Sequence, residues 1–356
     1  TYLYEQLDEV QRVYLHEDVA RVLERLYGVE VETIALVLAR HYQAARLATK
    51  AIDYLTLAGE QAVRLAANGE AAQHFTQALA LLSTLPESEA RHRQEVALRL
   101  RLGQTLMVSQ GFGAAAVGQA YTRTLALARQ LGENGQVIQA LLGLSQHALF
   151  RSELAVAQAY GEECLRLTAE NPDPEHGMAV NRILSRITSQ LGQHREAVAH
   201  YEEIIAFYRA RQPDLSFADS YSLAFTLAVM GLHLTPLGYP DRALRQAQEG
   251  LALVRRLDHH FGIVHCLCIV GYIHLMRGEW KAALGCAHKA LVGANTHNLP
   301  QMRLFAQMHE GVVLTRLGQA EKGIALVEQA IAEREAMGIT FGHRTTTLAR
   351  LAEACG

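Results

Sequence analysis

Histidine and cysteine side chains are concentrated between residues 259 and 288, where they could ligate a soft metal ion. The segment holds His259, His260, His265, Cys266, Cys268, His274, Cys286 and His288. Zinc prefers imidazole and thiolate ligands, but Cys266 and Cys268 would point about 200° apart on a helix and cannot chelate one ion together. His265 and Cys268 share a helical face and are the alternative ligand pair. Free cysteines commonly fill helical cores, so the sequence predicts no metal site and no cofactor.

Catalytic motifs are absent from the sequence. No serine stands in a Gly-x-Ser-x-Gly elbow, and there is no His-Glu-x-x-His pair. The adjacent acids 162–163 and 202–203 fall on predicted outer helix faces, where solvated surface carboxylates are expected. No Gly-x-x-x-x-Gly-Lys-Ser/Thr loop occurs either, so ATP hydrolysis would belong to another polypeptide segment. The sequence predicts that the chain is not an enzyme.

Two arginines offer a different kind of chemistry. Arg182 and Arg186 are four residues apart and lie one turn from each other on a helix. Like charges at this spacing repel mildly, but together they could fork onto a carboxylate or a phosphate. The alternative is that both arginines pair with Glu or Asp of a neighbouring helix.

A repeated frame of small residues must position these side chains. Gly271 is followed by Gly278 and then by Ala283, and the same seven- and five-residue steps recur elsewhere. The step between corresponding glycines is 40 residues from 231 to 271 and 40 from 271 to 311, and it is 46 from Ser185 to Gly231. A fixed period of this length indicates stacked two-helix units. The repeat-packing residues are Gly192, Ala197, Gly231, Gly238, Ala243, Gly271, Gly278, Ala283, Gly311 and Gly318.

The first glycine of each frame lies inside an apolar helical pattern. A glycine there costs about 1 kcal/mol relative to alanine, so its recurrence at one phase requires a packing reason. We expect the first helix of each pair to approach the second closely at this point, opposite the small residue twelve positions later.

The spacing and residue types resemble the tetratricopeptide repeat (TPR), with the best match from Leu184 to Ile205. The resemblance implies an all-α, right-handed superhelix of about eight helix-turn-helix units with a period of roughly 40 residues. In TPR folds the first helix of each pair lines a concave groove that holds a partner. Carried onto this sequence, the groove residues are Gln146, Phe150, Arg182, Arg186, Phe225, His265, Cys268, Tyr272, Phe305, Met308 and His309. The alternative is that a tightly wound array buries much of this apolar set.

The first sixty residues carry a second resemblance. The segment from Tyr4 to Glu24 resembles the end of the winged-helix segment of STAND-class signalling ATPases, and residues 38–62 resemble the junction where their TPR sensor begins. Residues 5–27 predict two short amphipathic helices that end at Gly28. The domains expected are therefore 1–30, a helical tail of an upstream winged-helix/ATPase module, and 31–356, a TPR-like array with a truncated last unit at 344–354.

This resemblance implies a non-enzymatic sensor and protein-interaction domain of a signal-transduction ATPase. Its groove would bind a partner segment, possibly an acidic peptide, or a small anionic ligand, and the ATPase domain would be a further partner. The alternative is a plain TPR scaffold without a switching role. Apolar stripes at the array ends also predict end-to-end self-association.

Composition excludes several other partners. The net charge is −3, and residues 1–30 carry seven acidic and three basic side chains, which leaves the remaining chain near neutral. A nucleic-acid binder would show a basic footprint, so no nucleic-acid partner is expected. No uninterrupted apolar run approaches 18 residues and there is no signal peptide, so no membrane partner is expected. Five cysteines, an odd number, in helical patterns indicate a reducing compartment, the cytoplasm.

Overall fold

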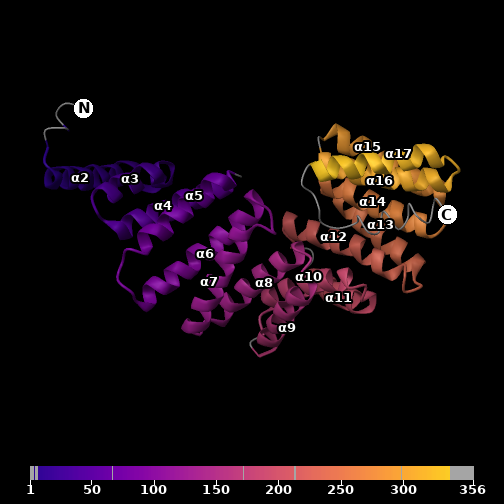
Figure 1. Ribbon diagram of the computed structural model, residues 1–356, viewed down its shortest axis with the longest axis horizontal. Helices are drawn as coiled ribbons and strands as arrows, with labels where there is room; N and C mark the ends of the chain where they lie inside the picture. Colours follow the sequence, from indigo (N-terminus) through magenta and orange to yellow (C-terminus); the bar gives the residue numbers. More distant parts are fainter. Residues whose placement is uncertain are drawn as a thin grey trace. The chain divides into compact units, whose positions relative to one another are not determined.

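The computed structural model describes residues 4, 7–65, 67–170, 172–211, 214–297 and 299–336. These residues form helices joined by turns, with no β-strand among them (Figure 1). The predicted half-unit at 344–354 lies outside the described residues. The chain divides into two compact units, residues 1–176 and 177–356, each considered by itself.

The first unit consists of consecutive helices that pack against their neighbours in sequence. They are α2 (Glu9–Tyr27), the 3-10 helix η1 (Gly28–Ile34), α3 (Ala35–Ala44), α4 (Ala48–Arg64), α5 (Asn68–Leu82), α6 (Glu89–Ser109), α7 (Ala115–Leu131), α8 (Asn134–Phe150) and α9 (Leu154–Glu170).

One helix, α2, stands where two short helices were predicted. No glycine or proline interrupts residues 9–27, so nothing stops the helix once it has started. Asp8 and Gln11 form a reciprocal capping box at its start, and Gly28 is the first residue beyond its end. Residues 9–27 therefore form one helix and not two short ones, while residues 5 and 6 of the predicted range lie outside the described residues.

The second unit repeats the two-helix pattern with regular lengths. Its helices are α10 (Pro174–Gln190), whose first three residues precede the boundary, α11 (His194–Arg209), α12 (Phe217–Leu234), α13 (Pro240–Arg256), α14 (His260–Met276), α15 (Trp280–Thr296), α16 (Pro300–Arg316) and α17 (Ala320–Ala336). Figure 1 shows α12 to α17 side by side, and α14 packs against both α12 and α16. First helices of successive pairs thus form a continuous row.

The glycines of the repeated frame have two structural roles, at helix crossings and at the turns between helices. A β-carbon built on Gly311 would lie 2.6 Å from the carbonyl oxygen of Gly323, and one on Gly231 would lie 2.9 Å from that of Ala243. The second glycines of the frame, for example Gly278 (φ +75°) and Gly318 (φ +83°), occupy the left-handed region and end the first helix of their pair. The first glycine therefore permits a close helix crossing, and the second permits the turn.

Helix α12 is the most apolar of the long helices among the described residues. Its length and mean hydropathy of 1.2 would allow it to cross a membrane, but half of it is buried inside the protein. It packs against α11, α13 and α14, as expected for a core helix of a repeat array.

Candidate functional site

Aromatic and imidazole side chains from α12, α14 and α16 meet along the row of first helices. The ring of Phe225 lies 5.0 Å from that of His265, and His265 meets Phe305 edge-on at 6.2 Å. His309 lies 4.6 Å from Phe305 and 6.1 Å from Tyr272, measured between ring centroids. All five side chains are half-buried. We call Phe225, His265, Tyr272, Phe305 and His309 the aromatic–imidazole ladder.

Two further rings lie next to the ladder: Tyr221, which was not singled out from the sequence, and His259, which was named only among the candidate metal ligands. Tyr221 stacks on His259 at 4.1 Å and lies 6.3 Å from Phe225. The Nδ1 atom of His259 accepts the backbone N–H of Gly262 at 2.9 Å and caps α14. The four-residue spacing of Phe217, Tyr221 and Phe225 on one helix was the signal that could have found Tyr221.

The two predicted groove arginines lie on α10 and differ in exposure. Arg182 is exposed, and no ion pair joins it to a carboxylate in the part of the chain that the structure describes. Arg186 is half-buried, and burial lowers the pKa of its guanidinium; Tyr201 opposes this shift and the positive charge of Arg182 adds to it. A desolvated cation beside a second cation favours an anion.

A buried polar network connects α10 and α11 to α12. His233 Nε2 lies 2.9 Å from Ser189 Oγ, and its Nδ1 lies 3.0 Å from Nδ1 of His194. His233 is 7% exposed, and burial, followed by the neighbouring His194, lowers its pKa to about 4. The network places α10 directly beside α12 and extends the row that carries the ladder.

A serine, an imidazole and a second imidazole in series could suggest a nucleophile and its base. The Ser189 hydroxyl, however, lies 2.5 Å from the carbonyl oxygen of Ser185 and donates to it. Ser189 Oγ must then accept from His233 Nε2–H, which leaves His233 Nδ1 to accept from His194. In this arrangement His233 cannot remove the hydroxyl proton, so the network is structural.

Two residues predicted to line the groove lie in the core instead. Cys268 and Met308 are each 1% exposed, Cys268 among the buried residues of the second unit and Met308 against Leu304 and Ala330. The position of a residue along a helix gives the direction of its side chain around the helix axis only roughly. The close packing of α14 and α16 covers both side chains. Burial raises the pKa of the Cys268 thiol, and no cluster of three metal-ligating side chains occurs among the described residues.

The remaining groove residues belong to the first unit. Phe150 stacks on Phe112 with ring centroids 4.4 Å apart, and His147 Nδ1 lies 2.9 Å from the Phe112 carbonyl oxygen. Phe150 therefore holds the loop between α6 and α7. Gln146 is half-buried on α8.

A polar cleft of about 280 Å³ lies between α6 and α8 of the first unit. Arg93 and Arg101 line it together with Gln104, Gln136 and Gln139, over a floor of Val96, Ala97 and Leu100. The Nε atom of Arg93 donates to Glu133 at 2.8 Å, and that of Arg101 donates to Glu60 at 2.9 Å. The positive charges of this cleft are thus already compensated by the protein.

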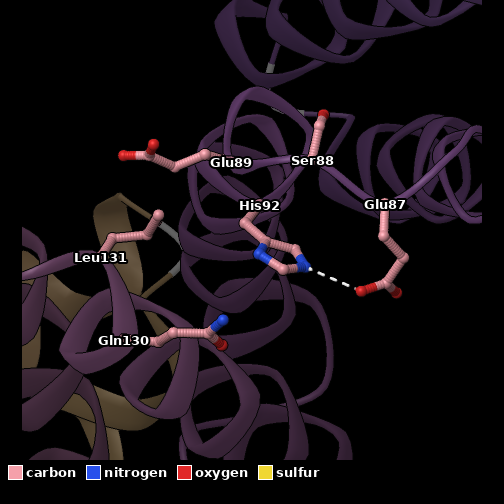
Figure 2. Close-up of a pocket in the computed structure, with 6 residues that line it drawn as sticks. All are labelled: Glu87, Ser88, Glu89, His92, Gln130 and Leu131. Atoms are coloured by element: carbon pink, nitrogen blue, oxygen red, sulfur yellow. Dashed lines mark ion pairs between the residues drawn. The ribbon is translucent and has the colours of Figure 1, made fainter.

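A second hollow, of about 320 Å³, lies at the start of α6 (Figure 2). Figure 2 shows the Glu87 carboxylate directed at His92, with which it forms a 3.4 Å ion pair, while Glu89 points away. Glu89 pairs with Arg93, and Ser88 accepts the Arg91 N–H as the cap of α6. These side chains hold the helix start, so we assign no ligand to the hollow.

Comparison with known proteins bears on the fold. No family model and no curated protein matches the sequence. Among solved structures, the apo form of RapI matches with a TM-score of 0.66 at 11% identity, covering 81% of this chain and 98% of that chain. A Rap conjugation gene regulator in complex with a peptide matches with a TM-score of 0.59 at 15% identity, over 89% of this chain and 78% of that chain.

A STAND protein with a tetratricopeptide repeat sensor from Pyrococcus horikoshii is also similar. The TM-score is 0.58 at 12% identity, over 94% of this chain and 49% of that chain. The present chain therefore corresponds to about half of that protein. These likenesses confirm the predicted fold class: the chain is an all-α, TPR-like helical repeat.

Proposed function

We propose that this chain is a non-enzymatic sensor and protein-interaction domain that binds an acidic peptide segment along α10, α12, α14 and α16. The observation that carries the proposal is the aromatic–imidazole ladder in one row with Arg182 and Arg186. Half-buried rings offer stacking and apolar contact, and the arginines offer two cationic forks for carboxylates. A small ligand bearing a carboxylate or a phosphate is the second candidate, since it needs the arginines but not the whole ladder.

The similar proteins support this class of function. One Rap regulator is in complex with a peptide, and the STAND protein from Pyrococcus horikoshii carries a TPR sensor. We propose that this chain is likewise the TPR sensor of a STAND-like ATPase, with residues 1–30 as the helical tail of its upstream winged-helix/ATPase module. Occupation of the ladder would change how the array lies against the ATPase domain, which is the partner within the same protein.

We further propose a cytoplasmic location, because the described cysteines are free thiols. Neither nucleic acid nor a membrane is proposed as a partner.

The test begins with a phage-displayed library of random peptides selected on the purified chain. We expect enriched peptides to combine acidic and aromatic or aliphatic residues. Their affinity should fall about tenfold or more in Phe225→Ala/Phe305→Ala, because two stacking surfaces are lost. Val292→Ala, an exposed apolar position on second helix α15, is the matched control and should bind as the wild type does.

Charge is tested separately. Arg182→Glu should weaken acidic peptides and remove most of the salt dependence of binding, since the charged contact is solvent-exposed and screened by salt. Arg182→Lys should recover only part of the affinity, because lysine cannot make the bidentate contact. Selection that yields no specific peptide, or peptides that bind all variants equally, would contradict the proposal.

The plain scaffold without a switching role remains the alternative function. It is separated from the sensor by adding a selected peptide to a longer protein that includes the ATPase domain. A sensor changes the ATPase rate or the oligomeric state when the peptide binds, whereas a scaffold binds the same peptide and changes neither.

A further inference from the structure

Helix α2 carries an apolar seam on the side that faces solvent. Leu15, Val19, Val22 and Leu26 follow one another on α2 at steps of four, three and four residues. This alternation is the pattern by which one helix packs against another along its length. Leu15 is 40% exposed, Val22 51% and Leu26 74%, so the described chain leaves about half or more of the seam open at Val22 and Leu26.

The opposite side of α2 is the one that holds the first unit together. Ala20 is fully buried and packs with Leu38, Tyr42 and Ala51 of α3 and α4, and Leu23 packs against the same cluster. The seam is therefore not needed for the fold of this unit. Large exposed apolar patches of this kind mark interaction surfaces.

Charges beside the seam indicate which partner fits it. Asp18 and Arg25 are seven residues apart and so lie on the same flank of the seam. Neither forms an ion pair within the described part of the chain, whereas Glu17 and Glu24 of the same helix pair with Arg21 and Lys50. The flank thus offers one negative and one positive charge, and a partner of a single sign would leave one of them unmatched.

A second copy of α2 matches both charges if it runs antiparallel. The two-fold axis then brings the same flank of both helices together, so Asp18 of each copy faces Arg25 of the other. In this register Leu15 packs beside Leu26 of the second copy, and Val19 packs beside Val22. A parallel pair would instead require the flank of Leu23, which is occupied by the body of the unit.

We propose that the chain self-associates through α2, which pairs antiparallel with α2 of a second copy along the seam of Leu15, Val19, Val22 and Leu26. The seam spans about 16 Å, from the eleven steps between Leu15 and Leu26 at about 1.5 Å each. An interface built on one helix pair is small, so the dimer is weak and reversible.

The charge pair gives a sharp test by sedimentation equilibrium of the whole chain over a range of concentrations. Asp18→Arg and Arg25→Asp should each weaken dimerisation about tenfold, since each puts like charges together twice per dimer. The double variant Asp18→Arg/Arg25→Asp restores both pairs in swapped order and should dimerise as the wild type does. Leu26→Lys should abolish the dimer, while Val292→Lys, equally exposed on α15, should leave it unchanged. Circular dichroism confirms that each variant is folded.

Direction is tested by cysteine cross-linking. A mixture of Leu15→Cys and Leu26→Cys chains should form a disulfide-linked heterodimer on mild oxidation, and neither variant alone should cross-link above the wild-type background. A monomer at all concentrations, a dimer that survives Leu26→Lys, or cross-linking of Leu15→Cys with itself would overturn the proposal. A monomer would mean that a different protein or segment covers the seam.

Discussion

The hydroxyl of Ser145 donates a 2.7 Å hydrogen bond to the carbonyl oxygen of Ala157, twelve residues later on the facing helix. The same twelve-residue relationship joins Gly231 to Ala243 and Gly311 to Gly323, where the backbone itself approaches that carbonyl. Where α8 and α9 cross, the position on the first helix is therefore occupied by a small polar side chain. In the later pairs the same position is occupied by glycine, which has no side chain.

Removing that hydroxyl should destabilise the first unit. Ser145 is fully buried, so we expect Ser145→Ala to lower the free energy of unfolding by about 1 kcal/mol through the lost hydrogen bond. Urea denaturation measures it. Thr296→Ala is the control, because that exposed hydroxyl bonds only to the Val292 carbonyl of its own helix. Equal stability of Ser145→Ala and the wild type would show that this hydrogen bond makes no net contribution to the free energy of unfolding.

Two glycines in second helices should respond to alanine with opposite sign. A β-carbon on Gly250 would lie 2.4 Å from the carbonyl oxygen of Ala224, whereas one on Gly285 meets nothing within 4 Å. We expect Gly250→Ala to destabilise by about 1–3 kcal/mol through overpacking, and Gly285→Ala to stabilise by up to about 1 kcal/mol through helix propensity. Thermal melting of both variants decides this. A gain in both would mean that α12 and α13 can move apart without loss.

The strained backbone at Ser152 predicts that a substitution there can increase the stability of the protein. Ser152 has φ of +61°, at the turn position that glycine occupies in later pairs, as at Gly318. We expect Ser152→Gly to raise the free energy of unfolding by about 1 kcal/mol, because the left-handed conformation costs an L-residue about that much. Gly318→Ser should do the reverse. Ser152→Ala keeps the strain, so a gain in that variant would assign the effect to something other than φ.

Acid should destabilise the second unit through His233. Burial, followed by the neighbouring His194, lowers its pKa from 6.5 to about 4, so the unfolded chain binds a proton at higher pH than the folded chain does. Stability conferred by the neutral imidazole is complete above pH 6.5 and is lost as the pH falls towards 4, by about 3 kcal/mol. The pKa of His200 in the same unit is also lowered, mainly by burial, and acts in the same direction.

Urea denaturation at several pH values between 7.5 and 4 measures this loss. His233→Gln should flatten the pH profile, while His297→Gln, at an exposed position, should leave its slope unchanged. An unchanged slope in the His233 variant would assign the acid sensitivity to other groups.

The sequence by itself determined the repeat. Glycine allows two helices to approach each other closely, and it allows a backbone with positive φ. Because both requirements recur in every helix pair, the glycines recur in the sequence at a fixed period. The frame at Gly231, Gly271 and Gly311 predicted helix pairs and their crossing points, and the structure confirms both. Local chemistry also fixes two helix starts, since Pro240 and Pro300 occupy the first helical position, where the missing N–H of proline costs nothing.

Only the tertiary structure decided which side chains share a surface. A helical frame assigned His265, Cys268 and Met308 to one groove, yet the packing of neighbouring helices leaves His265 half-exposed and covers the other two. The contact of Ser189 with His233 spans 44 residues, and no local pattern encodes it. Burial depends on helices distant in sequence, whereas helix formation and turning depend on residues close to one another along the chain.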